Sequence, residues 1–290
     1  MKRLLKILGI VIGPIGLVIV ALVLYGQMRF NSDIGKVQNQ PALGIVADTS
    51  NVKLGERIAT IRNGCIHCHG ADLGGFTFID DPMMGSMSGA NITPAKLKDR
   101  TDEEIARAIK YGLNRENKSL IFMPSFEYQY LSNSDIASLI AYIRSVPAVE
   151  KDSPKISIGP MAKILFGLGK MPNLVAANEL IDPSINIQKP AEENTVEFGK
   201  YMVNSGCIGC HRMDLTGGTI PGAPPDWPPA SALNDLKSKG YTAEKFPQVL
   251  RSGVKPDGTN LKLPMVASTA RLMTDDELGA IWKYLESAGN

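Results

Sequence analysis

The first feature of the hydrophobic pattern is an uninterrupted apolar stretch near the N-terminus. Residues 7–25 are 19 positions without a charged side chain, and three basic residues precede them. This length is typical of a helix that spans a bilayer, and the flanking positive charges predict that the N-terminus stays inside the cell. A cleaved secretory signal is the alternative, but the end of the stretch offers no small-x-small cleavage site. We therefore expect a retained transmembrane anchor over residues 1–30, followed by a polar tether over residues 31–51.

Beyond residue 51 the apolar positions recur with the period of a helix. Residues 101–104 read Thr-Asp-Glu-Glu, a capping box that opens a helix with Ile105, Ala108 and Ile109 on its apolar face. Sustained alternation typical of strands is found nowhere along the sequence. The prediction is an all-α fold with long loops, whose other helices are expected over about 53–63, 132–146, 195–204, 242–252 and 274–288.

The helical pattern occurs twice along the chain, with a separation of 142 positions. After that shift, the apolar positions of residues 136–145 fall on those of residues 278–287. A period this long indicates a duplicated domain and not a solenoid of short repeats. We predict one domain over residues 52–148 and a second over residues 194–290.

The segment between the two predicted domains, residues 149–193, contains five prolines and an apolar middle over residues 161–168. A free linker would be more polar. We expect this segment to be a strap that packs on the domains. Docking of a partner and contact with the membrane surface are the alternatives.

Each predicted domain carries one C-x-x-C-H motif. This motif attaches c-type haem, because its two thiols can add to the two vinyl groups of one porphyrin and the adjacent His reaches the iron. All four cysteines of the chain lie in the two motifs, so none is left for a structural disulfide. We predict two covalently bound haem c groups, attached through Cys65, Cys68, Cys207 and Cys210, with His69 and His211 as iron ligands.

Two C-x-x-C pairs could instead converge on one tetrahedral zinc ion. The two pairs are separated by more than a small domain, and each is followed by its own histidine. The haem interpretation is therefore favoured over the zinc interpretation.

The second axial ligand of each iron has few candidates in this chain. The one other histidine, His67, lies between the paired cysteines on the proximal side of the haem and cannot reach the opposite face. Methionine is the remaining soft donor, and a His/Met pair raises the potential of a cytochrome c.

The repeat selects one methionine in each domain. Met123 follows His69 by 54 positions, and Met265 follows His211 by the same 54 positions. Simple packing is the alternative role for these side chains, because methionine fills gaps in cores well. We predict that Met123 and Met265 bind the two irons; the fallback candidates in the first domain are Met83, Met84 and Met87.

These residues resemble class I cytochromes c in a dihaem arrangement. In that family an N-terminal helix leads into C-x-x-C-H, a methionine loop follows, and a C-terminal helix crosses the first. The resemblance implies that Gly55 and Gly199 are the small residues at the two helix crossings, with Tyr142 and Tyr284 as aromatic partners.

Three shorter stretches look like the cytochrome subunits of membrane-bound alcohol and gluconate dehydrogenases. They are residues 253–258, residues 263–265 and Asn91-Ile92-Thr93-Pro94. The resemblance implies that Asn91 lies close to the haem propionates. Those subunits usually carry three haems, whereas this chain has two haem motifs.

The chain has 31 basic and 29 acidic residues and no long basic run, which argues against nucleic acid binding. The favoured function is an electron-transfer protein and not an enzyme, with its haem domains on the periplasmic side of the cytoplasmic membrane. Its redox partner would be a quinol-oxidising enzyme, a dehydrogenase or a terminal oxidase. The alternative is a dihaem enzyme, of the peroxidase or thiosulfate dehydrogenase type, with one open iron.

Overall fold

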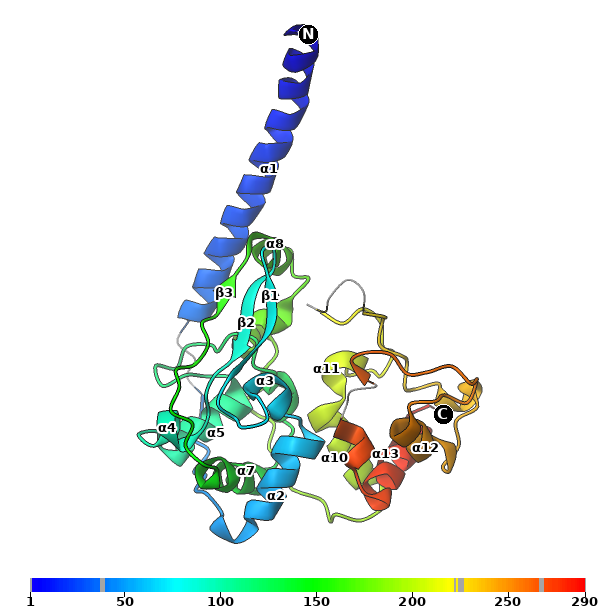
Figure 1. The fold of residues 1–290 in the computed structure, drawn as a ribbon. Helices are drawn as coiled ribbons and strands as arrows, with labels where there is room; N and C mark the ends of the chain where they lie inside the picture. The colour runs from blue at the N-terminus through cyan, green and yellow to red at the C-terminus, as the bar shows by residue number, and fades with distance from the viewer. Residues whose placement is uncertain (1, 37–39, 222, 224–226, 266–268, 290) are drawn as a thin grey trace.

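The structure is a computed structural model that describes residues 2–36, 40–221, 223, 227–265 and 269–289, and only the backbone of residues 2–11. A long N-terminal helix, α1 (Lys2–Gly35), projects away from two helical domains (Figure 1). The first domain lies at the base of this helix and the second lies beside the first. The mostly helical class predicted from the sequence is confirmed, with one long apolar helix ahead of the two domains.

Each domain is built around one pair of crossing helices. In the first domain α2 (Val52–Arg57) crosses α7 (Asn133–Ser145), and in the second α10 (Val196–Gly206) crosses α13 (Asp275–Ala288). The remaining helices are short: α3 (Ile66–His69), α4 (Pro94–Leu97), α5 (Asp102–Tyr111), α6 (Ser125–Tyr128), α8 (Pro160–Gly167), α9 (Ala176–Glu179), α11 (Ile208–His211), α12 (Lys245–Ser252) and the 3-10 turns Thr49–Asn51, Pro172–Val175, Leu236–Lys239 and Thr269–Leu272.

The helix crossings have no room for a side chain at their two glycines. A Cβ atom on Gly55 would lie 2.0 Å from the carbonyl oxygen of Ser138, and one on Gly199 would lie 1.9 Å from that of Ala280. The added atom on Gly55 would also lie 2.8 Å from the Cβ atom of Tyr142, and the one on Gly199 would lie 3.0 Å from the Cβ atom of Tyr284. The predicted small residues and aromatic partners at the crossings are therefore confirmed.

We expect that Gly199→Ala strongly destabilises the second domain, because the new methyl group meets backbone that cannot rotate away. Overpacking of this kind costs about 3 kcal/mol or more when the backbone itself must move. Thermal unfolding followed by circular dichroism measures the loss. The control is Gly35→Ala at the end of α1, where an added Cβ meets nothing within 4 Å and the melting temperature should stay unchanged. Equal melting temperatures for both variants would contradict the close crossing.

Helix starts follow the polar signals read from the sequence. Thr101 accepts a hydrogen bond from the Glu104 backbone N–H while the Glu104 side chain accepts one from Thr101, which confirms the capping box of α5. Thr274 and Glu277 form the same reciprocal pair at the start of α13. Helix α5 of the first domain and helix α13 of the second therefore begin with the same local chemistry.

A small antiparallel sheet was not predicted from the sequence. It consists of β1 (Phe76–Asp81), β2 (Gly85–Gly89) and, from the strap, β3 (Ser157–Ile158), in the order β1-β2-β3. A tight turn creates the hairpin, because Gly85 has a φ of +98° and the Asp81 carboxylate accepts hydrogen bonds from two backbone N–H groups of the turn. Burial does not alternate along these short strands, so no period of two could be read from the side chains.

The segment between the two domains packs on the first domain. Its helix α8 lies against α1, and an apolar cluster that includes Phe30, Phe166 and Leu174 fills the space between them. The helix α1 therefore continues through the first part of the expected tether and ends at Gly35, with Asp33 buried. Within the described residues, one helix, Ile12–Gly35, is long and apolar enough to cross a membrane.

The two domains share one interface, and a buried ion-pair cluster lies in it. A π-helical turn, Ile58–Arg62, follows α2 and is closed by a hydrogen bond from the Asn63 N–H to the Ile58 carbonyl. The guanidinium groups of Arg57, before this turn, and of Arg62, at its end, both bind the carboxylate of Glu277 in the second domain. The Arg62 Nε to Glu277 Oε1 distance is 2.7 Å, and the side chains are 5 % and 3 % exposed.

Further contacts surround this buried cluster. Glu192 of the strap binds Arg62 at 2.6 Å and Lys189 at 2.6 Å, and the Arg62 guanidinium lies 5.5 Å from the ring centre of Phe198. Apolar side chains of both domains join in one continuous core cluster. The relative position of the domains is thus fixed by apolar packing and by buried charge together.

Candidate haem-binding site

The first C-x-x-C-H motif lies directly after the π-helical turn and forms α3. The His69 Nδ1 atom is 2.7 Å from the carbonyl oxygen of Ala90. A carbonyl oxygen can only accept, so Nδ1 carries the proton and Nε2 keeps its lone pair. A backbone carbonyl that orients a histidine in this way is the usual partner of a metal-binding imidazole.

The second motif has the same arrangement around α11. His211 Nδ1 lies 2.8 Å from the carbonyl oxygen of Ser231. The loops after the two motifs also repeat bond by bond. Gly75 N–H donates to the His69 carbonyl at 2.8 Å, and Gly217 N–H donates to the His211 carbonyl at 3.1 Å. The duplication read from the sequence thus extends to the loop that orients each histidine.

Burial changes the acidity of all four cysteine thiols. It raises the pKa of Cys65 and Cys207 to about 12 and the pKa of Cys68 and Cys210 to about 11. The thiols are therefore protonated and uncharged near neutral pH. Among the residues that the structure describes, no group of three or more His, Cys, Asp or Glu side chains could hold a metal ion.

The residues of each motif fit a covalently attached haem. Both offer two neighbouring free thiols and one imidazole with an available Nε2. Gly89, behind the first motif, has no space for a Cβ, which would lie 2.1 Å from the Cys68 carbonyl oxygen. The thiols would hold the porphyrin and the imidazoles would bind the iron, which supplies reversible one-electron chemistry.

The two methionines predicted as iron ligands lie on loops after the histidines. Met123 is partly buried against the main core, and the preceding Phe122 N–H donates to the Leu174 carbonyl of the strap at 2.9 Å. Met265 is partly buried, and residues 266–268 that follow it lie outside the described part of the chain. The assignment of both methionines to iron stays a prediction.

Asn91 is buried and has all its amide hydrogen-bonding capacity in use. Its two N–H groups donate to the carbonyls of Val149 and Lys151, and its oxygen accepts from the N–H and hydroxyl of Thr93. The side chain therefore ties the loop next to Ala90 to the strap, and through that loop it holds the orientation of His69. Its contact with the haem stays a prediction that rests on this position.

Helix α6, directly after the methionine loop, touches both haem motifs. Tyr128 is buried, and its hydroxyl donates to the Asn63 carbonyl beside the first motif at 3.3 Å. The carboxylate of Glu127 points to the other motif, where a Cβ on Gly209 would lie 1.9 Å from its Oε1 atom. Sequence reasoning missed Glu127, because no local pattern signals a contact with the other domain.

We expect the midpoint potential of the second domain to fall as pH rises through about 7. Burial raises the pKa of Glu127 from 4.5 to about 7, although the Gly209 N–H favours the carboxylate. An ionised carboxylate stabilises the oxidised, more positive iron centre. The stability contribution has the same direction: it is present at low pH and is lost as pH rises from 4.5 to about 7.

Glu127→Gln should raise that midpoint potential by roughly 60 mV above pH 7, which corresponds to a tenfold change in the equilibrium constant of a one-electron reduction. The substitution should also remove the pH dependence of the potential. Spectroscopic redox titration at pH 6 and pH 8 measures the shift. The control is Glu116→Gln, at an exposed position of the first domain, which should behave as the parent protein. A pH dependence that persists in Glu127→Gln would contradict this assignment.

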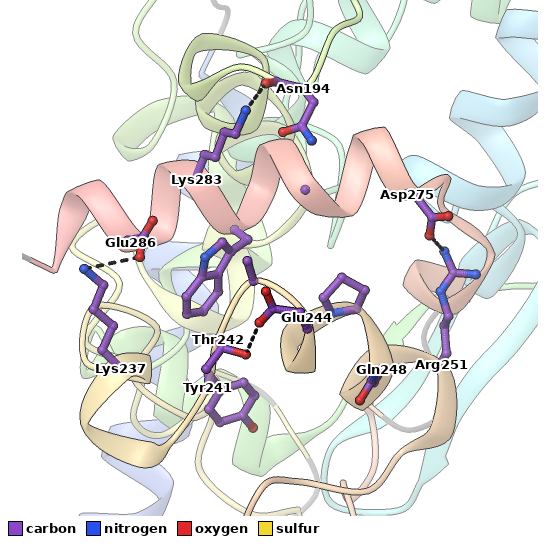
Figure 2. A pocket seen from close by; sticks show the side chains of 14 residues that line it. Asn194, Lys237, Tyr241, Thr242, Glu244, Gln248, Arg251, Asp275, Lys283 and Glu286 are labelled. Atoms are coloured by element: carbon purple, nitrogen blue, oxygen red, sulfur yellow. Dashed lines mark hydrogen bonds and ion pairs between the residues drawn. The ribbon is translucent and has the colours of Figure 1, made fainter.

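A cavity of about 810 Å³ lies between α12 and α13, away from the haem motifs (Figure 2). Its charged groups already have partners: Lys237 binds Glu286, Arg251 binds Asp275, and Lys283 donates to the Asn194 carbonyl. The lining contains no residue of either motif. This cavity is therefore not a haem site.

Family models and curated relatives give an independent view of both domains. Residues 51–143 match the model described as cytochrome C oxidase, cbb3-type, subunit III, and residues 196–289 match the model described as cytochrome c. The chain therefore contains two cytochrome c domains, and domains of this kind imply covalently bound haem c.

Among curated proteins, the chain is similar to cytochrome subunits of dehydrogenases. The alcohol dehydrogenase (quinone) cytochrome c subunit of Gluconobacter oxydans is 26 % identical over 274 residues, which is 83 % of this chain and 55 % of that protein. The corresponding subunit of Komagataeibacter europaeus is 27 % identical, over 83 % of this chain and 56 % of that protein. The fructose dehydrogenase cytochrome subunit of Gluconobacter japonicus is 33 % identical over 36 % of this chain and 24 % of its own length. The chain spans about half the length of the alcohol dehydrogenase relatives.

Proposed function

We propose that this chain is a membrane-anchored dihaem cytochrome c that transfers electrons and is not itself an enzyme. The observation that carries the proposal is the repeated histidine geometry, in which Nδ1 of His69 and of His211 is bound to a backbone carbonyl. The sequence register adds Met123 and Met265 as the second ligands. Two ligands on each iron would leave no site on the metal for a substrate.

The proposed redox partner is a membrane-bound dehydrogenase, with the chain as its cytochrome subunit. Support comes from the similarity to subunits named for alcohol and fructose dehydrogenases. The apolar helix α1 supports a single-pass anchor with the haem domains on the periplasmic side. The shared interface supports electron transfer between the haems within one rigid unit.

Reduction of the haems in native membranes tests this function. Addition of an alcohol or sugar substrate should reduce the haem c of membranes that contain the chain, as seen by visible spectroscopy. Membranes with the Cys207→Ala/Cys210→Ala variant should show impaired electron transfer to the terminal acceptor. Reduction by quinol alone, with none from any dehydrogenase substrate, would contradict the dehydrogenase partner.

A further inference from the structure

The contact between α1 and α8 is a close approach of two backbones at Gly26 and Gly167. A Cβ on Gly26 would lie 2.0 Å from the carbonyl oxygen of Lys163, and one on Gly167 would lie 2.9 Å from Gly26 Cα. Arg29 strengthens the contact, because its guanidinium donates to the Gly167 carbonyl at 3.2 Å and pairs with Glu179 at 2.6 Å. The position of α8 along α1 is therefore fixed.

This contact lies where the anchor would leave the bilayer. The uncharged stretch begins at Ile7. About 20 helical residues at 1.5 Å each cross a hydrocarbon core of about 30 Å, so the helix would emerge near Gly26. Since α8 packs against Gly26, it would lie at the level of the lipid headgroups. This step rests on the proposed membrane anchor.

The surface of the strap in this region combines apolar and basic side chains. Ile156, Met161 and Leu168 are 40 %, 38 % and 53 % exposed. Residues 153–178 contain no acidic residue, and their three lysines, Lys155, Lys163 and Lys170, have no ion pair within the described residues. A segment of this composition favours the interface of an anionic membrane.

The hairpin that packs on α8 carries two acidic residues, Asp80 and Asp81. The Asp81 carboxylate accepts hydrogen bonds from the backbone N–H groups of Met83 and Met84, so it is held in its own turn. Residues 153–178 of the strap themselves contribute only basic charges to this end of the domain. Figure 1 places α8 at the end of the first domain from which α1 projects.

We propose that the segment Ile156–Lys170 lies on the bilayer surface and binds anionic phospholipid headgroups. The apolar side chains enter the headgroup region, and the lysines bind phosphate. Together with the rigid contact to α1, this second attachment fixes the orientation of the first haem domain relative to the membrane.

Photo-crosslinking of the full-length holoprotein in nanodiscs tests the proposal. Benzoylphenylalanine is placed at Leu168, at Leu17 on the exposed face of α1, or at Val254 in the second domain, in discs of phosphatidylcholine and phosphatidylglycerol. Mass spectrometry should find lipid adducts at positions 168 and 17 and none at position 254. Adducts at position 17 without adducts at position 168 would overturn the proposal and leave the anchor intact. Absence of adducts at position 17 would overturn the anchor, and the surface attachment with it.

The headgroup of the adduct at position 168 tests the lysines. The ratio of phosphatidylglycerol to phosphatidylcholine in the adducts should be about fivefold higher than in the disc, the effect of roughly 1 kcal/mol for one basic residue near the surface. Lys163→Gln/Lys170→Gln should return this ratio to that of the disc, while the exposed control pair Lys53→Gln/Lys262→Gln should leave the enrichment unchanged. An adduct composition equal to that of the disc in the parent protein would overturn anionic recognition.

Discussion

Replacing Cys207 and Cys210 with alanine is expected to remove one of two covalently bound haems. The pyridine haemochrome absorbance per polypeptide should fall by half, and the denatured protein should lose one porphyrin mass. The reason is that each motif supplies its own pair of thiols, and the other pair lies in the other domain.

The matched variant Cys65→Ala/Cys68→Ala should also lose half of the haem, and the fourfold variant should lose all of it. An unchanged haem content in either double variant would show that the motif is not an attachment site. Retention of zinc by the parent protein in place of haem would favour the zinc interpretation.

Replacing Arg62 with methionine should destabilise the protein by about 3–5 kcal/mol, because it leaves the buried Glu277 carboxylate without one of its two guanidinium partners. Both side chains are almost fully buried, so water cannot replace the lost ion pair. Denaturant unfolding followed by circular dichroism measures this difference. The variant should also slow electron exchange between the haems, because the domain interface loses a contact that fixes their positions.

The control for this substitution is Lys96→Met, which breaks the exposed pair between Lys96 and Asp152. Surface pairs contribute at most about 1 kcal/mol, so this variant should unfold almost as the parent does. Equal losses in the two variants would contradict a special role for the buried interface.

Acid should weaken the same interface. Hydrogen bonds from Arg62 lower the pKa of Glu192 from 4.5 to about 2, and partners including Arg57 lower the pKa of Glu277 despite its burial. A lowered carboxyl pKa gives a stability contribution that is complete above 4.5 and is lost as pH falls to about 2. The Arg62→Met variant should therefore lose less stability than the parent over this range.

The sequence predicted features that depend on local chemistry or on the repeat. The capping box of Thr101 and Glu104 depends only on residues within one helical turn, and Gly55 and Gly199 have the same role in two copies of one fold. These predictions are confirmed by hydrogen bonds and by the space at each glycine. Haem ligation by the methionines depends on a cofactor and stays a prediction.

Features that depend on distant contacts could not be predicted. The hairpin at Gly85 is held by β3 of the strap, and the π-helical turn places Arg62 against a glutamate 215 positions away. Glu127 lies in a short helix of the first domain, but its carboxylate is buried and faces Gly209 of the other motif. In each case the contacting residue comes from a distant part of the chain, and the local pattern of hydrophobic and polar positions carries no information on such contacts.

The oxidised visible spectrum of the purified protein tests the central claim most directly. The weak band near the red edge that marks a methionine bound to ferric haem should appear with an amplitude that corresponds to both haems. Met123→Ala and Met265→Ala should each remove half of it. Half of the amplitude in the parent protein, or a high-spin signal, would mean that one iron is open and would contradict the account of a pure electron carrier.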